Sequence, residues 1–129
     1  MIKDILLVDD DADDISIFEE ALNDVDSLIN FHSAKNGVKA LEFLLSGQSN
    51  APDLIFLDIN MPEMNGWQCL SKLKSTPRLQ QIPVILYSTS ASKMDEQKAY
   101  SLGAIAIYQK PERFEKLKYI INSIVKDFV

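Results

Sequence analysis

The segment Leu54-Ile55-Phe56-Leu57-Asp58 is a run of four apolar residues that ends in an aspartate. Three further apolar runs have a similar length, at residues 5–8, 84–87 and 104–108, and a more mixed one covers residues 28–33. Such runs are too short for helices, and their continuous apolar character is typical of parallel strands buried on both faces. The mixed composition of residues 28–33 predicts a strand at the edge of the sheet.

Amphipathic segments separate the five runs, with apolar residues three or four positions apart, as in helices that bury one face. They cover residues 12–25, 37–46, 64–75 and 92–102, and the last follows Pro111 and carries apolar residues from Phe114 to Phe128. Gly47 and Thr76 are predicted helix ends. This alternation predicts an α/β fold, a doubly wound five-stranded parallel sheet with five helices on its two faces. The chain is too short for an eight-unit barrel of roughly 250 residues.

The composition is that of one globular domain. The chain has 129 residues, 47% of them hydrophobic and 25% charged, and we expect residues 1–129 to form a single domain without an attached output domain. The single cysteine, Cys69, cannot form an internal disulfide. No membrane-spanning run or signal peptide is recognisable, so we expect a cytoplasmic protein with no membrane partner.

The net charge of −6 is unevenly distributed along the chain. Residues 1–31 carry ten of the nineteen acids and one base, a balance of −9, and the remainder carries nine acids and twelve bases, a balance of +3. An acidic chain without a basic stripe is a poor match for nucleic acid, where phosphate contacts dominate affinity. We therefore exclude nucleic acid as a partner.

Polar residues follow four of the five predicted strands, at the edge where doubly wound sheets bind ligands. They are Asp9-Asp10-Asp11, Asp58, Ser88-Thr89-Ser90 and Lys110-Pro111. Two carboxylates about 4 Å apart repel by roughly 4 kcal/mol at an effective dielectric near 20, so a cation is required between them. Oxygen ligands without His or Cys favour a hard ion such as Mg²⁺.

The charges of these residues suit phosphoryl transfer. Asp9, Asp10 and Asp58 contribute −3, which one Mg²⁺ and Lys110 would balance. Asp58 is the best candidate nucleophile because it is a single acid that ends the central strand, and Ser88 is a candidate hydrogen-bond donor to the transferred group. No glycine-rich phosphate loop is present, so a nucleotide is not the expected ligand.

Four motifs in this order resemble the receiver domain of two-component response regulators, over essentially the whole chain. They are Leu6 to Asp11, Asp53 to Gly66, Ile82 to Ser88, and Lys110-Pro111. The resemblance implies a flavodoxin-like strand order of 2-1-3-4-5, the order that is known for a chemotaxis receiver. It also implies a stand-alone, CheY-like response regulator that is not a turnover enzyme and that accepts a phosphoryl group from a histidine kinase or phosphotransfer protein.

The resemblance assigns a role to each residue at the strand ends. Asp58 matches the phosphoacceptor, Asp10 the direct Mg²⁺ ligand and Asp9 its neighbour that acts largely through water. Asn60 matches the position whose backbone carbonyl binds the metal. Ser88 matches the hydroxyl that moves toward the phosphoryl group.

The remaining family positions concern the lysine and the output face. Lys110 matches the lysine that contacts the phosphoryl group, and its bond to Pro111 is often cis in the family. Ile107 occupies the family's aromatic switch position, with Tyr108 one place later, and Thr89 stands where a small residue is common. The resemblance implies a partner surface formed by the fourth helix, the fifth strand and the fifth helix, and homodimerisation through that face or the last helix.

Plainer interpretations exist for several of these residues. We expect Asp11, Asp13 and Asp14 to be only acids at a helix N-terminus, with Asp11 as a possible N-cap. Ser90 or Ser92 is expected to cap the fourth helix. We expect Cys69 and Trp67 to be core or partly buried, and His32 to be structural because no carboxylate or Cys is near it in sequence.

Two other functions remain open at this point. An aspartyl-phosphate phosphatase would use similar chemistry, but such enzymes need a second acid two residues after the nucleophile, where this chain has Asn60. A pseudo-receiver would only bind a partner, and its folding and binding would not respond to Mg²⁺ or to substitution of Asp58.

Overall fold

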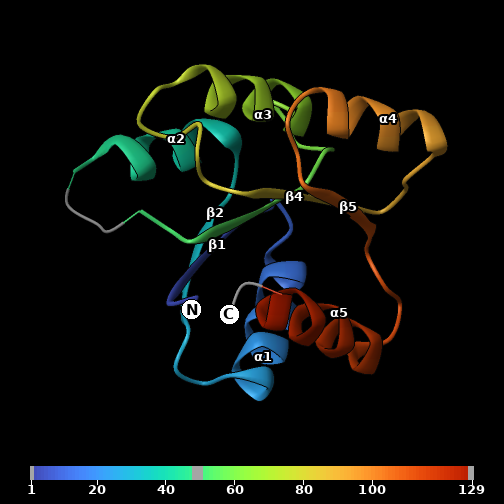
Figure 1. Cartoon of the computed structure of the whole chain (residues 1–129). Coiled ribbons are helices and arrows are strands. Elements are labelled where there is room, and N and C mark those ends of the chain that lie inside the picture. Colours follow the sequence, from blue (N-terminus) through green and yellow to red (C-terminus); the bar gives the residue numbers. More distant parts are fainter. Residues whose placement is uncertain (1, 48–50, 128–129) are drawn as a thin grey trace.

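The computed structural model describes residues 2–47 and 51–127, in which two layers of helices enclose one parallel sheet (Figure 1). The strands are β1 (Asp4–Val8), β2 (Asn30–Ala34), β3 (Leu54–Leu57), β4 (Val84–Ser88) and β5 (Ala106–Gln109). The helices are α1 (Ala12–Val25), α2 (Gly37–Leu45), α3 (Gly66–Ser75), α4 (Lys93–Ser101) and α5 (Phe114–Asp127). The strand order is β2-β1-β3-β4-β5. The predicted fold, order and edge position of β2 are confirmed.

The alternation of side chains along each strand builds two cores. In β1, Leu6 and Val8 pack into the core below α2, α3 and α4, whereas Ile5 and Leu7 pack against α1 and α5. Because consecutive side chains of a strand point to opposite faces, a strand buried on both sides must be apolar throughout. This is why the short apolar runs of the sequence become the central strands.

The ends of several elements differ from the predicted ones. The helix predicted over 64–75 begins at Gly66, because the Asn65 side chain caps it and accepts the N–H of Gln68 at 2.9 Å. The last strand begins at Ala106 instead of 104, since the Ala104 N–H donates to the preceding helix rather than to β4. The edge strand covers Asn30–Ala34 instead of 28–33.

Other predicted helix ends are confirmed. Thr76 is the C-cap of α3, and Gly47, just after α2, has a left-handed backbone with φ of 73°. Ser92, not Ser90, caps α4, and its hydroxyl accepts the Asp95 N–H at 3.0 Å. Phe128, expected on the last helix, lies outside the described residues.

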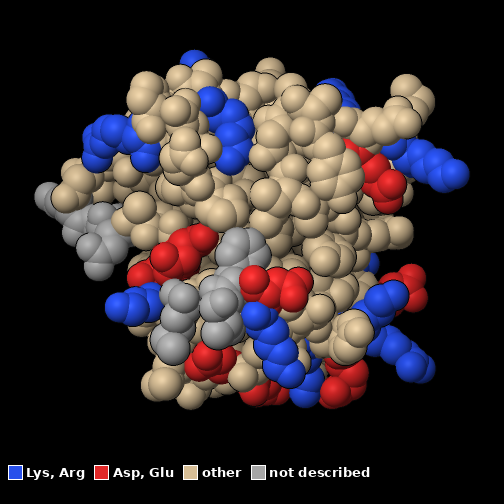
Figure 2. Space-filling model, in the orientation of Figure 1, with Lys and Arg blue, Asp and Glu red and all other residues tan. Residues whose placement is uncertain are grey.

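The surface reflects the uneven charge of the sequence. On the face shown in Figure 2, most acidic side chains lie in the lower half of the view, on the side of α1 and α5. The described helices include none with both the length and the apolar character needed to cross a membrane.

Candidate functional site

The carboxyl ends of β1 and β3 lie side by side and place two aspartates at one edge of the sheet. Asp9 follows β1, and its N–H donates to the Ala34 carbonyl at 3.0 Å. Asp58 follows β3, and its N–H donates to the Val8 carbonyl at 2.9 Å. These bonds continue the sheet pattern by one residue, so both backbones are held before the side chains take any part.

Three carboxylates converge at this edge. Asp9, Asp10 and Asp58 each offer an oxygen, and these oxygens lie within 4.8 Å of one another. Asp9 and Asp58 are 0% and 4% exposed, whereas Asp10 is exposed. Buried like charges at this spacing repel strongly, and an all-oxygen donor set fits a hard divalent cation such as Mg²⁺. The residues present therefore fit a metal site open to solvent on the Asp10 side.

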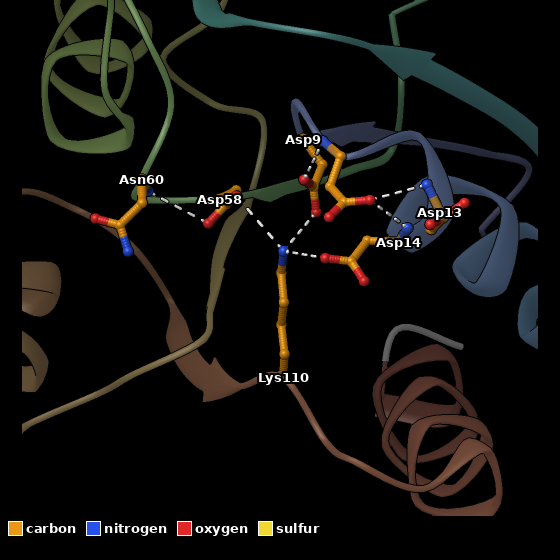
Figure 3. A network of polar contacts seen from close by, with 7 residues as sticks. Asp9, Asp13, Asp14, Asp58, Asn60 and Lys110 are labelled. Carbon is orange, nitrogen blue, oxygen red and sulfur yellow. Dashed lines mark hydrogen bonds and ion pairs between the residues drawn. The ribbon is translucent and has the colours of Figure 1, made fainter.

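From the end of β5, Lys110 reaches two of these carboxylates, those of Asp9 and Asp58, and also the carboxylate of Asp14 (Figure 3). Its Nζ lies 2.7 Å from Asp9 Oδ2, 2.8 Å from Asp14 Oδ2 and 3.5 Å from Asp58 Oδ2. The backbone N–H of Lys110 donates to the Ser88 carbonyl at 2.6 Å, which links the ends of β4 and β5. The peptide bond between Lys110 and Pro111 is trans, in contrast to the cis bond that is frequent in the family.

The acid and the ammonium shift each other's ionisation. Burial raises the pKa of the Asp58 carboxyl, Lys110 opposes this and Asp9 adds to it, and the net result is a pKa of about 6. Burial alone would lower the pKa of Lys110, but hydrogen bonds to Asp14 and Asp9 more than offset this and hold it above its usual value. At neutral pH the lysine is therefore charged, and Asp58 is mostly an anion that a bound cation would stabilise further.

Ser88 contributes a hydroxyl without a partner. The residue is 1% exposed, and its Oγ makes no hydrogen bond within the described residues. An unsatisfied buried polar atom costs about 1–3 kcal/mol, so such atoms call for an explanation in terms of a ligand or a movement. The next residue, Thr89, is exposed, and its carbonyl accepts the Gln109 Nε2 at 3.2 Å.

The loop after Asp58 is compact because of Gly66. A Cβ on this glycine would lie 2.6 Å from the Ile59 Cα and would also clash with the Asp58 carbonyl. The Gly66 N–H donates to the Ile59 carbonyl at 2.8 Å, so the start of α3 lies directly on the backbone behind Asp58. The Asn60 N–H donates to Asp58 Oδ1 at 3.3 Å, and Figure 3 shows the Asn60 side chain pointing away from the carboxylates.

One expectation about the acids was wrong. Asp14 is not merely a surface acid of the first helix, because its carboxylate binds Lys110 at the site. Asp11 is the N-cap of α1, as predicted, and accepts the N–H groups of Asp13 and Asp14. Asp13 is exposed, and its carboxylate contacts no cation within the described residues. Only one of the three acids assigned to the helix start therefore belongs to the site.

The two candidate switch residues of β5 lie on opposite faces of the sheet. Ile107 packs against the core below α2, α3 and α4, whereas Tyr108 packs against the core of α1 and α5. Ser88 lies two residues beyond Leu86, which shares the face of Ile107. By strand alternation Tyr108 is on the wrong face to exchange places with the Ser88 side chain.

Further residues have contacts that sequence reasoning missed. The ring of Tyr87 lies 5.6 Å from Lys110 Nζ, and burial raises the pKa of the Tyr87 hydroxyl to about 12. His32 Nε2 lies 3.0 Å from Asp4 Oδ1, a carboxylate that the neighbouring strand supplies. Cys69 is buried and Trp67 is partly buried, as expected. A pattern of apolar residues contains no signal for such cross-strand pairs.

Comparison with known proteins places this geometry in a family. Residues 5–122 match the family described as the response regulator receiver domain. A probable cyclic di-GMP phosphodiesterase of Vibrio cholerae is 35% identical over 92% of this chain, but the match covers only 26% of that protein. The chain thus spans about a quarter of the length of this relative.

Two solved structures match over nearly their full length. The phosphorylated cyanobacterial phytochrome response regulator RcpA is 31% identical, with a TM-score of 0.87 and coverage of 98% of this chain and 93% of that one. The Mn²⁺-bound response regulator Rcp1 is 30% identical, with a TM-score of 0.81 and coverage of 98% and 94%. The chain belongs to the response regulator receiver domain family of two-component signalling proteins.

Proposed function

We propose that this protein is a phosphoacceptor that receives a phosphoryl group on Asp58 in the presence of Mg²⁺. The observation that carries the proposal is the position of the Asp58 carboxylate, with Lys110 Nζ 3.5 Å away and carboxylate oxygens of Asp9 and Asp10 within 4.8 Å. The unpartnered Ser88 Oγ supports it, since a phosphoryl oxygen would supply the missing hydrogen-bond partner.

The chemistry needs one nucleophile and charge stabilisation. A carboxylate oxygen of Asp58 attacks the phosphorus, and the bond from phosphorus to a phosphohistidine nitrogen, or to the leaving oxygen of acetyl phosphate, breaks with its electron pair leaving on that atom. Lys110 and the Ser88 hydroxyl donate to phosphoryl oxygens as charge spreads over them. Asp9, Asp10, Asp58 and the Asn60 backbone carbonyl would hold Mg²⁺, which supplies further charge neutralisation when bound.

A phosphorylation assay tests the function directly. The protein is incubated with acetyl phosphate and Mg²⁺, and intact mass is measured. We expect a gain of one phosphoryl group that is lost in Asp58→Asn and retained in the matched control Asp53→Asn, an exposed aspartate just before β3. An undiminished gain in Asp58→Asn would refute the assignment of the acceptor. The assay includes a divalent ion because the similar response regulator Rcp1 has an Mn²⁺-bound form.

Signalling would then proceed through altered partner binding. Receiver domains take their signal from histidine kinases and pass it to downstream partners, and we place the output on α4, β5 and α5. Large apolar side chains are exposed there: Met94, Tyr100, Ile105 and Tyr119. Switch movements would involve Ser88, Thr89 and Ile107.

Homodimerisation is a separate part of this proposal. Sedimentation with and without beryllofluoride, a mimic of a carboxylate-bound phosphoryl group, tests it. We expect association to strengthen with the mimic, and a monomer in both states would refute phosphorylation-driven assembly through this face.

A further inference from the structure

The Asp14 carboxylate reaches the site from a different element than the other acids. It projects from the first turn of α1 and binds Lys110 Nζ at 2.8 Å, about as closely as Asp9 does at 2.7 Å (Figure 3). Asp58 is further away, at 3.5 Å. The ammonium is therefore drawn toward α1 and away from the candidate acceptor.

The surroundings of the Lys110 ammonium limit which other groups it can contact. The Lys110 side chain is 10% exposed, and the Tyr87 ring lies 5.6 Å from Nζ. An ammonium has three N–H donors, and the two shortest contacts here involve Asp9 and Asp14. The contact with Asp58 is the longest of the three, so the ion pair between Lys110 and Asp58 is the weakest.

The charges show what Asp14 adds. Asp9, Asp10 and Asp58 carry −3 together, and Lys110 carries +1. Asp14 adds −1, so the four carboxylates and the lysine together carry −3 with Asp14 and −2 without it. Without Asp14, the ammonium would share itself between Asp9 and Asp58 only and would compete with a cation for their oxygens.

We propose that Asp14 is a positioning residue for Lys110: it holds the ammonium on the α1 side, which favours cation binding at the empty acceptor and weakens the hold of Lys110 on a phosphoryl group. This inference rests on the proposed function. In this proposal, Asp14 shifts the site toward cation binding without a phosphoryl group and away from the phosphorylated state.

The substitution Asp14→Asn separates the two effects because they have opposite signs. The dissociation constant for Mg²⁺ is expected to rise about two- to fivefold, the range for a partly exposed charge pair. At saturating Mg²⁺, the affinity for beryllofluoride is expected to increase by a similar factor, since Lys110 is free to move toward Asp58. Both are measured by titration, with the fluorescence of Trp67 as one readout and calorimetry as another.

Two variants serve as controls. Asp13→Asn removes the same charge from the same helix turn, next in sequence, without touching Lys110, and both constants should stay within about twofold of the wild type because exposed charges are screened. Asp14→Glu keeps a carboxylate and should return both constants toward wild-type values. Thermal unfolding checks that all variants are folded.

The outcomes distinguish the inference from the function. The positioning role is refuted if Asp14→Asn and Asp13→Asn change the dissociation constants for Mg²⁺ and beryllofluoride equally. It is also refuted if Asp14→Asn weakens the binding of both ligands. In either case the phosphoacceptor function stands. If the wild type binds neither Mg²⁺ nor beryllofluoride, the proposed function itself fails, and the role of Asp14 fails with it.

Discussion

The pair α1 and α5 and the single helix α4 are held to the same sheet very differently. α1 buries Phe18, Ala21 and Leu22, and α5 buries four apolar residues, whereas Ala99 is the buried residue of α4. The α1 and α5 side also holds an aromatic cluster in which the Phe18 ring lies 4.9 Å from that of Phe56. The large apolar burial of α1 and α5 makes them, with the sheet, a stable unit that we call the frame. The near absence of such burial leaves α4 weakly attached to the sheet.

This difference divides the candidate site into two halves. Asp14 belongs to α1, and Lys110 lies just before α5, so the charged half of the site is anchored to the frame. Ser88 lies on the other half, where residues 89–92 lead into α4. A movement of the Ser88 side chain therefore has the weakly held α4 as the next helix along the chain, while the Ser88 backbone stays bonded to the Lys110 N–H.

Phe18→Ala is the strongest test of the frame. Loss of a fully buried Phe costs about 3–5 kcal/mol of unfolding free energy, because transfer and cavity terms add. The matched change on α4, Met94→Ala, removes a side chain that is 79% exposed and should cost less than about 0.5 kcal/mol. Urea denaturation measures both values, and similar losses in the two variants would contradict the comparison.

Asp58→Asn tests whether the site is held at the expense of stability. Burial raises the pKa of Asp58 from 3.8 to about 6, so the folded protein binds more protons than the unfolded chain between these values. Stability therefore falls as pH rises through this window, and above pH 6 the ionised Asp58 is destabilising. Without divalent cations, Asp58→Asn should be more stable than the wild type at pH 7 by about 1–3 kcal/mol.

The pH dependence supplies the control for that experiment. The gain should shrink as the pH falls and approach zero below about pH 3.8, where Asp58 becomes protonated in the unfolded chain as well as in the folded protein. Asp13→Asn, at an exposed position, should show no such gain at pH 7. A stability difference between Asp58→Asn and the wild type that stays constant from pH 4 to pH 7 would contradict the role of burial.

Ser92→Ala tests the attachment of α4 at its start. The Ser92 hydroxyl and the Asp95 carboxylate form a capping box, and loss of an N-cap costs about 1 kcal/mol. Since few other contacts hold α4, hydrogen exchange of its amides should accelerate while that of α5 stays unchanged. Ser90→Ala, in the exposed loop before it, is the control and should change neither helix. Equal acceleration in α4 and α5 would mean that the two helices open together.

Much of this arrangement follows from patterns along the chain. Apolar runs buried on both faces predict the parallel sheet, and the polar residues that end them must then share one edge, as Asp9, Asp58, Ser88 and Lys110 do. The catalytic roles of these residues remain predictions that the experiments above address. The resemblance, rather than periodicity, supplied the strand order.

Asp14 shows what such patterns leave out. Asp13 and Asp14 are neighbours in the first turn of α1, and the rotation of α1 against the sheet decides which of the two faces Lys110. One signal was present: Asp14 lies four residues before Phe18, which is fully buried, and residues four apart share a helix face. Sequence patterns also leave out which face of the sheet Tyr108 occupies, because the position of a strand relative to its neighbour decides this.

Lys98→Ala is the finest test of how α4 is held. Lys98 Nζ lies 4.5 Å from the centre of the Trp67 ring on α3, a cation–π contact worth about 0.5 kcal/mol at an exposed site. Its loss should change the emission of Trp67, the only tryptophan, and should lower unfolding free energy by about that amount. Lys93→Ala removes the same charge from the first turn of α4, where it makes no ring contact among the described residues, and should leave the emission unchanged. If both variants alter it equally, the contact with Trp67 does not tie α4 to α3, and Ala99 and the Ser92 cap are what hold the helix against the sheet.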